Sequence, residues 1–380
     1  MRVKAVVHLD RFLANLESVK TRIGSKLICV PVKADAYGHG AVQIAKASLK
    51  AGAYCFGVAS VSEGAELRKA GIAAPILLYS QPSPDEIQEI VKAELTPFVS
   101  DAEFAAVLND SAKTAKIKLQ VHIKVDTGMG RIGCAPGNAL ALALKIAKCS
   151  NLKLTGTATH LAVSDSVKIA DIDFTKKQLS RFKKVVNDLR KAGINPGIVH
   201  AANSGAVILH PDAWLDMVRP GILLYGYKVI QEIEAPVKQL KKLMKYKAIA
   251  AEPVMELITT VSLIKKIKKG ESVSYGRTWI AQENTNIAVL SIGYADGLPR
   301  LAGNSWQALI GGEAYPFAGR ITMDQCCVDL GKKTKVKQWD EAIIFGGAAP
   351  DAAELAKTAA TIPYEITCGI NKRVPRVYKQ

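Results

Sequence analysis

Two hydrophobic patterns divide this chain of 380 residues near residue 230. Before that point, short apolar runs alternate with stretches whose apolar residues recur every three or four positions. The runs are typical of buried strands and the stretches of amphipathic helices. We expect strands at residues 27–32, 54–59, 75–79, 96–99, 119–125, 152–159, 197–201 and 216–224. Helices are expected between them at 41–50, 62–70, 84–92, 101–108, 138–148 and 174–191.

Eight strands that alternate with helices predict an α/β fold, a (β/α)8 barrel of the TIM type. A doubly wound parallel sheet is the alternative, and the first residues are expected to pair elsewhere. Later the pattern becomes mainly β, with a basic helical stretch at 237–247, strands at 255–263, 272–274, 287–292, 308–310, 325–330 and 341–345, and a helix at 352–360. We therefore expect a barrel over residues 1–230 and a C-terminal β domain over residues 231–380.

The composition is that of a protein with sizeable cores and no membrane span. Hydrophobic residues make up 49% of the chain, but no run of about twenty apolar residues occurs. The first acidic residue, Asp10, comes too early for a secretory signal. The seven cysteines are odd in number and lack metal-type spacing, which favours reduced thiols. We expect a cytoplasmic protein without a metal site or a membrane partner.

The formal net charge of +17 raises the question of nucleic-acid binding. Lysines cluster at residues 238–245, 265–269 and 332–337. These clusters are not interleaved with aromatic residues, as a platform for single strands requires, and no nucleic-acid module is recognisable. A solvated basic face that draws carboxylate substrates inward is the favoured interpretation, with no nucleic-acid partner.

Unusual polar residues follow the predicted barrel strands. Barrel enzymes place their active sites at the C-terminal ends of the strands, which all open at one mouth. The sequence therefore predicts that one site gathers the residues at these ends: Lys33, Lys124, Asp126, Arg131, His160, Asn203, Ser204, Arg219, Gly221 and Ile222.

Lys33 stands out because it ends a strand that reads as fully buried. An unpaired ammonium is costly to bury, whereas a lysine that forms an imine has a reason to lie there. A lysine that extends its ammonium to solvent is the alternative for this residue alone.

A phosphate site is expected after the seventh and eighth strands. The Asn203-Ser204-Gly205 turn and Gly221-Ile222 occupy the positions where barrels commonly bind phosphate, through backbone N–H groups and a hydroxyl. Taken alone, Asn-Ser-Gly is an ordinary turn.

A glycine pattern suggests a nicotinamide alternative. Gly128-x-Gly130-x-x-Gly133 follows a predicted strand, as in dinucleotide-binding folds. However, Pro136-Gly137 interrupts any helix there, and no acidic residue follows at the required distance. Nicotinamide binding is therefore disfavoured.

Taken as a whole, the string Val32-Lys33-Ala34-Asp35-Ala36-Tyr37-Gly38-His39-Gly40 resembles the pyridoxal-phosphate lysine motif of alanine racemases. Further matches at 121–133, 217–222, 273–278, 292–297, 319–325 and 373–377 spread over nearly the whole chain. The resemblance implies an isomerase that interconverts L- and D-alanine with pyridoxal 5'-phosphate and supplies D-alanine for peptidoglycan. A racemase of broader range and a non-catalytic barrel protein that binds the cofactor are alternatives. A barrel-plus-β-domain decarboxylase is another, but its motifs are not found.

The resemblance also implies residue roles. Lys33 holds the cofactor as a Schiff base and serves as one catalytic base, and Tyr275 serves as the other. The cofactor phosphate is held by Tyr37, Ser204, Gly221, Ile222 and Tyr364, with Asn203 in the same turn. Arg219 faces the pyridine nitrogen and, because an arginine does not surrender its proton, leaves that nitrogen unprotonated.

Further roles follow from the same resemblance. Arg131 reaches the cofactor and the substrate carboxylate, and a carbamate on Lys124 positions it. The Met323 backbone N–H also binds the carboxylate, and a chain of Tyr275, His160 and Arg219 activates the phenol. The family is expected to form homodimers with shared active sites. Residues 227–230 depart from the usual serine-proline turn, which leaves the inter-domain linker unassigned.

Overall fold

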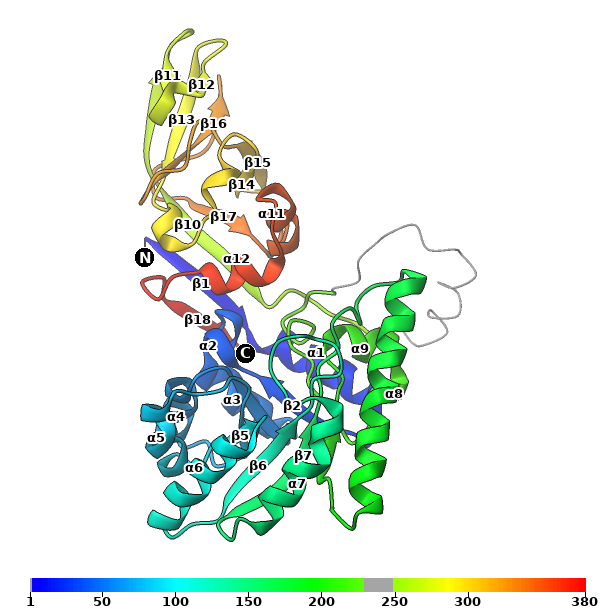
Figure 1. The fold of residues 1–380 in the computed structure, drawn as a ribbon. Helices are drawn as coiled ribbons and strands as arrows, with labels where there is room; N and C mark the ends of the chain where they lie inside the picture. The colour runs from blue at the N-terminus through cyan, green and yellow to red at the C-terminus, as the bar shows by residue number, and fades with distance from the viewer. Residues whose placement is uncertain (1, 229–248) are drawn as a thin grey trace.

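The computed structural model describes residues 2–228 and 249–380, which form a barrel and a second, mainly β domain (Figure 1). The helical stretch expected at 237–247 and the lysines at 238–245 lie outside the described residues. Among the described residues, no helix is both long and apolar enough to cross a membrane.

The first domain is a closed parallel barrel of eight strands, which confirms the TIM-type prediction and excludes the doubly wound sheet. Its strands are β2 (Leu27–Pro31), β3 (Cys55–Val58), β4 (Ile76–Leu78), β5 (Thr96–Val99), β6 (Leu119–Lys124), β7 (Leu152–Ala158), β8 (Ile198–His200) and β9 (Met217–Val218). Its helices include α3 (Ala41–Lys50), α4 (Val61–Lys69), α5 (Ile87–Lys92), α6 (Ala102–Thr114), α7 (Ala139–Lys148), α8 (Ile169–Lys191) and α9 (Ser204–Leu209).

The largest local difference from the sequence prediction is the eighth strand. A strand was expected over residues 216–224, but β9 covers only Met217–Val218 and turns follow from residue 222. Pro220 has no backbone N–H to donate to a sheet, so the ladder ends before it. Because the strand stops there, the backbone around Gly221 is free to shape the barrel mouth.

A helix that the sequence analysis did not predict, α1 (Leu9–Ile23), precedes the barrel. It buries Phe12, Leu16 and Val19 on one face, at the spacing of an amphipathic helix. The strand before it, β1 (Val3–His8), does not join the barrel. It pairs with strands of the second domain, so the chain begins in the β domain and then crosses to the barrel.

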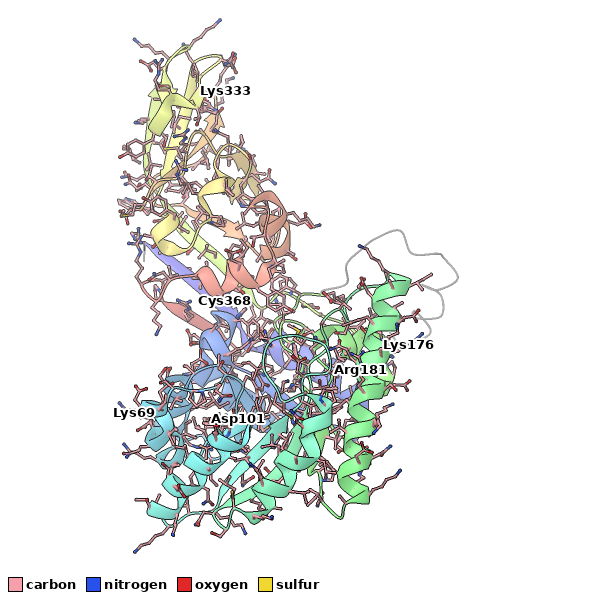
Figure 2. The ribbon with its side chains drawn as sticks, in the orientation of Figure 1. Lys69, Asp101, Lys176, Arg181, Lys333 and Cys368 are labelled. Atoms are coloured by element: carbon pink, nitrogen blue, oxygen red, sulfur yellow. The ribbon has the colours of Figure 1, made fainter. Side chains whose placement is uncertain are left out.

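The second domain is built around a long central strand, β10 (Met255–Ile267), which pairs with β1, β13 and β17. The other elements are β11 (Ser272–Val273), β12 (Trp279–Ile280), β13 (Thr285–Leu290), β14 (Gln307–Ile310), β15 (Glu313–Pro316), β16 (Cys326–Gly331), β17 (Glu341–Phe345), α11 (Ala352–Thr358), α12 (Pro363–Gly369) and β18 (Arg376–Lys379). This mainly β sheet confirms the predicted fold class. Helix α12, on which Figure 2 labels Cys368, lies next to the barrel mouth.

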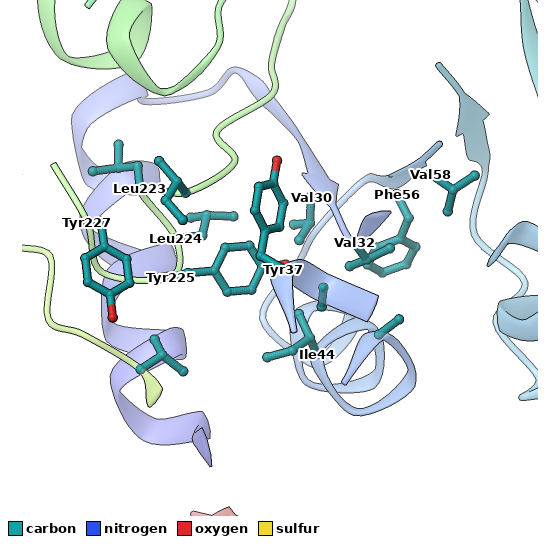
Figure 3. Packing of buried hydrophobic residues seen from close by; sticks show 14 of the residues in the cluster. Val30, Val32, Tyr37, Ile44, Phe56, Val58, Leu223, Leu224, Tyr225 and Tyr227 are labelled. Carbon is teal, nitrogen blue, oxygen red and sulfur yellow. The ribbon is translucent and has the colours of Figure 1, made fainter. Parts of the chain in front are cut away.

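Aromatic packing fixes the segment after the first barrel strand (Figure 3). The ring centroids of Tyr37 and Tyr225 lie 4.8 Å apart, and those of Phe12 and Tyr225 lie 5.7 Å apart. The buried Tyr225 hydroxyl donates a hydrogen bond to the Pro31 carbonyl at 2.8 Å. These contacts join the first strand, α1 and the turn after the eighth strand into one support beneath the barrel mouth.

Candidate active site

A cavity of about 410 Å³ opens at the C-terminal ends of the barrel strands. It brings together most of the residues predicted from the sequence: Lys33, Tyr37, Lys124, Arg131, His160, Asn203, Ser204, Arg219, Gly221 and Tyr364. Barrel strands and the loops after them contribute nearly all of these side chains, whereas Tyr364 comes from α12 of the second domain. The gathering follows from the closed parallel topology, in which all strand ends meet at one mouth.

Lys33 begins an uncommon backbone turn. The four residues after it, Ala34 to Tyr37, have left-handed conformations with φ between 52° and 54°. Such conformations are costly for residues other than glycine and persist where surrounding contacts impose them. The Glu63 carboxylate supplies one of these contacts, because it accepts a hydrogen bond from Ala34 N–H at 2.7 Å. Its other oxygen accepts from Ala59 N–H after β3, also at 2.7 Å.

The Lys33 amine lies in an environment that favours its neutral form. Burial lowers the pKa of Lys33 below its ordinary value, and the positive charge of Arg131 lowers it further. A neutral amine is the nucleophilic form that a carbonyl compound requires. The position and charge state of Lys33 therefore suit imine chemistry better than a solvated ammonium.

A second part of the cavity is rich in hydrogen-bond donors. The Ser204 hydroxyl oxygen accepts from Gly221 N–H at 2.9 Å, and Asn203 caps α9 through Ala206 N–H at 3.1 Å. A Cβ at position 221 would lie 2.5 Å from the Tyr37 hydroxyl, so only glycine allows the backbone at position 221 to lie this close to Tyr37. Burial raises the pKa of Tyr37 and keeps its phenol protonated as a donor. Because Gly221 N–H is paired with the Ser204 oxygen, the groups that remain to donate are the Ser204 and Tyr37 hydroxyls, and these fit a phosphate group.

Arg219 is a buried residue of the cavity lining and is held by four acceptors. Its guanidinium donates to His200 Nδ1 at 2.6 Å, His160 Nδ1 at 3.3 Å, and the carbonyls of Thr159 and Ala201 at 2.8 Å and 3.2 Å. Because a guanidinium only donates, both imidazoles accept at Nδ1 and carry their hydrogen on Nε2. His160 thus presents an N–H donor to the cavity side.

This network continues through His200 and His122, two residues that the sequence motifs did not predict as part of the site. His200 Nε2 lies 2.9 Å from His122 Nδ1, and the deduced tautomer makes His200 the donor. Burial, with Arg219 as the second cause, lowers the pKa of His122 to about 3, and burial likewise keeps His200 neutral. The period-two pattern offered one signal, since His122 shares a strand face with Lys124.

The glycine pattern after the fifth expected strand serves Asp126 rather than a dinucleotide. The Asp126 carboxylate accepts from Gly128 N–H at 2.9 Å, Met129 N–H at 2.8 Å and Gly130 N–H at 2.9 Å. A pyrophosphate would need these same N–H groups free. The loop is therefore closed on its own side chain, and its function is to present Arg131 and Met129 to the cavity.

Comparison with known proteins identifies the family. Residues 7–229 match the family model of the alanine racemase N-terminal domain, and residues 254–378 match that of the C-terminal domain. The chain belongs to the alanine racemase family. An alanine racemase of Treponema denticola is 51% identical to it, over 99% of this chain and 97% of that protein. The resemblance recognised from the sequence motifs is thereby confirmed.

Solved structures of the family agree with the fold over the whole chain. The alanine racemase of Clostridium difficile 630 has a TM-score of 0.91 at 35% identity, covering 100% of this chain and 96% of that one. The alanine racemase of Bartonella henselae, solved with covalently bound pyridoxal phosphate, has a TM-score of 0.85 at 26% identity and covers 100% of both chains. Pyridoxal phosphate is therefore the cofactor of this family, as the sequence motifs imply.

Three of the residues implied by the alanine racemase motifs do not line the cavity. Within the part of the chain that the structure describes, the lining includes neither Tyr275 nor Met323, and Ile222 is buried beside it. Tyr275 is 73% exposed and Met323 53% exposed, and both belong to the second domain. Tyr275 lies between β11 and β12, which Figure 1 shows at the end of that domain remote from the barrel. One chain thus gathers Lys33 and the residues expected to hold the cofactor, but not Tyr275, the expected second base.

Lys124 lies deep in the cavity beside other cations. Its ammonium nitrogen is 5.1 Å from the centroid of the Phe98 ring. Burial lowers the pKa of Lys124 well below its ordinary value, and Arg219 and Arg131 lower it further, while Asp126 opposes the shift. The lowered pKa favours a neutral Lys124 amine. A neutral amine is nucleophilic, as it must be to form a carbamate with carbon dioxide.

Proposed function

We propose that Lys33 and Tyr275 exchange the Cα proton on opposite faces of the substrate when this enzyme interconverts L- and D-alanine. The isomerase activity itself follows from membership of the alanine racemase family over nearly the full chain. The observation that carries the residue assignment is the position of Lys33, a half-buried amine of lowered pKa that lines the cavity at the mouth of the barrel.

The cavity residues fit pyridoxal phosphate. Lys33 is proposed to hold it covalently, and Tyr37, Ser204, Gly221 and Tyr364 to hold its phosphate through hydroxyl and backbone donors. When bound, the cofactor acidifies the Cα–H of an attached amino acid by taking up the electron pair that the departing proton leaves. Arg219 is proposed to donate to the ring nitrogen without giving up a proton, which limits side reactions through excessive electron withdrawal.

Tyr275 is proposed to act in the cavity of a partner copy. A phenol has a pKa near 10 and needs a hydrogen-bond donor or positive charge to act as a base near neutrality. His160 offers such a donor at Nε2 because its Nδ1 accepts from Arg219. The exposure of Tyr275 and Met323 supports a two-fold dimer in which each β domain covers the partner's barrel mouth.

Arg131 and Lys124 are proposed to work as a pair. An ammonium on Lys124 would repel Arg131, whereas a carbamate would reverse the sign and hold the guanidinium toward the substrate carboxylate. Electron density at the head of Lys124 in a crystal of the holoenzyme tests this. An unmodified ammonium, with or without a chloride beside it, would contradict the proposal for that crystal form.

The enzyme supplies D-alanine, and we propose cell-wall peptidoglycan as its destination and the cytoplasm as its location. The seven cysteines are free thiols, which supports a reducing compartment. Racemisation assays on a panel of L-amino acids separate strict alanine specificity from a broader range. A non-catalytic role predicts no turnover of any of them.

Borohydride reduction of the holoenzyme tests the lysine assignment directly. Peptide mapping should find the reduced cofactor on Lys33, and Lys33→Ala should abolish both the label and the activity. Lys69→Ala is the matched control, because Lys69 is an exposed lysine on α4 and is labelled in Figure 2 away from the barrel mouth. A label on any other lysine would overturn the assignment.

A further inference from the structure

The turn that carries Met323 is clamped by a neighbouring turn that begins at Gly293. Tyr294 N–H donates to Thr322 O and Ala295 N–H donates to Met323 O, both at 3.0 Å. The two backbones lie so close that a Cβ at position 293 would be 2.2 Å from Thr322 O. These contacts with the Gly293 turn therefore fix the position of the Met323 backbone.

That supporting turn is organised around a buried carboxylate, Asp296, whose side chain is fully inaccessible. One oxygen accepts from Gly293 N–H at 2.9 Å. The other accepts from Arg373 Nε at 2.8 Å and pairs with Arg2. A carboxylate taken out of water is stable only when its charge and lone pairs are matched in this way. Asp296 thus draws two arginines, one from each end of the chain, onto one turn.

Both arginines continue to the residue after Met323. Arg373 Nη2 lies 2.8 Å from Asp324 Oδ1, and Arg2 Nη1 donates to the Asp324 carbonyl at 3.4 Å. Hydrogen bonds with Asp296 and Asp324 raise the pKa of Arg373, so the guanidinium stays charged throughout. The Met323 turn is consequently held by backbone hydrogen bonds from the Gly293 turn and by two charged arginine side chains.

We propose that Asp296 is a positioning residue for the substrate carboxylate, acting through Arg2 and Arg373 on the backbone of Met323. This inference rests on the proposed function, in which the Met323 N–H binds that carboxylate. Hydrogen bonds to a charged group depend steeply on geometry. Losing the central charge releases both arginines and lets the Met323 turn shift away from the substrate, which weakens binding more than it slows the proton transfers.

The test is steady-state kinetics of Asp296→Asn holoenzyme. We expect KM for alanine to rise about ten-fold or more, the effect of losing a hydrogen bond to a charged group, with a smaller change in kcat. The inhibition constant of propionate, which has the carboxylate but no amine, should rise in parallel. Glu256→Gln is the matched control. Glu256 is also a buried carboxylate of the β domain, and its ion-pair partners are His8 and Arg11, with Oε1 2.8 Å from His8 Nε2, rather than residues of the Met323 turn. It should lose stability with KM unchanged.

A second variant keeps the test decisive if Asp296→Asn does not fold. Asp324 has a side chain that is 55% exposed, so Asp324→Asn is expected to fold, and loss of its ion pair should raise KM about two- to five-fold. Unchanged KM and propionate inhibition in the folded variants would overturn the inference while leaving the racemase function intact. An equal rise of KM in Glu256→Gln would also overturn it, because the effect would then be general destabilisation. A wild-type holoenzyme that does not racemise alanine would refute the proposed function as well.

Discussion

Mixing two inactive variants distinguishes a shared active site from one built within a single chain. Lys33→Ala removes the cofactor lysine, and Tyr275→Phe removes the phenol that one chain does not bring to its own cavity. Each homodimer should be nearly inactive, since a missing general base typically costs roughly a hundredfold or more. In a mixed dimer with shared sites, one cavity carries both changes and the other carries neither.

The recovered activity can be calculated from this geometry. Random exchange between equal amounts of the two variants makes half of the dimers mixed, and one of the two sites in each mixed dimer is intact. The mixture should therefore recover about 25% of wild-type activity at equal protein concentration, for a closed two-fold dimer. If Tyr275 acted in its own chain, every site of the mixed dimer would carry one of the two changes and no activity would return.

The assay follows D-alanine formation after the variants are mixed under conditions that permit subunit exchange. Different affinity tags on the two variants allow the mixed dimer to be isolated and the exchange to be measured independently. Each variant put through the same procedure alone provides the baseline. An inactive mixture in which tagged mixed dimers are demonstrably present would refute the shared-site arrangement.

Three further predictions concern the same framework. Tyr275→Ala should slow exchange of the Cα hydrogen of L-alanine more than that of D-alanine, and equal, slight effects would argue against a two-base mechanism. Burial and Arg219 lower the pKa of His122 to about 3. As the pH falls through about 6.5, His122 therefore becomes protonated in the unfolded chain but stays neutral in the folded protein. The contribution of His122 to the free energy of unfolding therefore declines by up to about 1.4 kcal/mol per pH unit as the pH falls below about 6.5. The urea-unfolding midpoint, measured between pH 7 and pH 4.5, should depend less on pH in His122→Asn than in the wild type. An unaltered pH dependence would contradict the reasoning. Tyr225→Phe removes the hydroxyl that donates to the buried Pro31 carbonyl at 2.8 Å, and it should lower the free energy of unfolding by about 1–3 kcal/mol. Leu13→Ala, on the neighbouring face of α1, is the reference variant.

Local signals located many elements closely. The strand Thr96–Val99 and the helix Ala41–Lys50 have the bounds that periodicity predicted. The cavity residues were accessible in the same way, because each follows a predicted strand and a closed parallel barrel brings all strand ends to one mouth. Motif resemblance then supplied the chemistry, which alternation of strands and helices cannot provide.

The strained backbone after Lys33 could not be predicted from local sequence patterns. Propensity disfavours four consecutive left-handed residues after Lys33. Contacts from distant elements, such as Glu63 on α4 and Tyr225 after β9, help to hold that turn in place. The hydrogen-bonded pair of His122 and His200 likewise depends on the barrel, which places their strands, β6 and β8, on either side of β7.

The amino-acid sequence by itself determined the barrel, the later β domain and the family, and it predicts Lys33 as the cofactor lysine. The tertiary structure alone decided that β1 lies between β10 and β18 in the second sheet, that Arg2 and Arg373 meet on Asp296, and that Tyr275 stands away from its own cavity. Hydrophobic periodicity reports which face of an element is buried, and so it specifies elements well. It carries no information on which remote element covers that face, because such pairings depend on the closure of the whole chain.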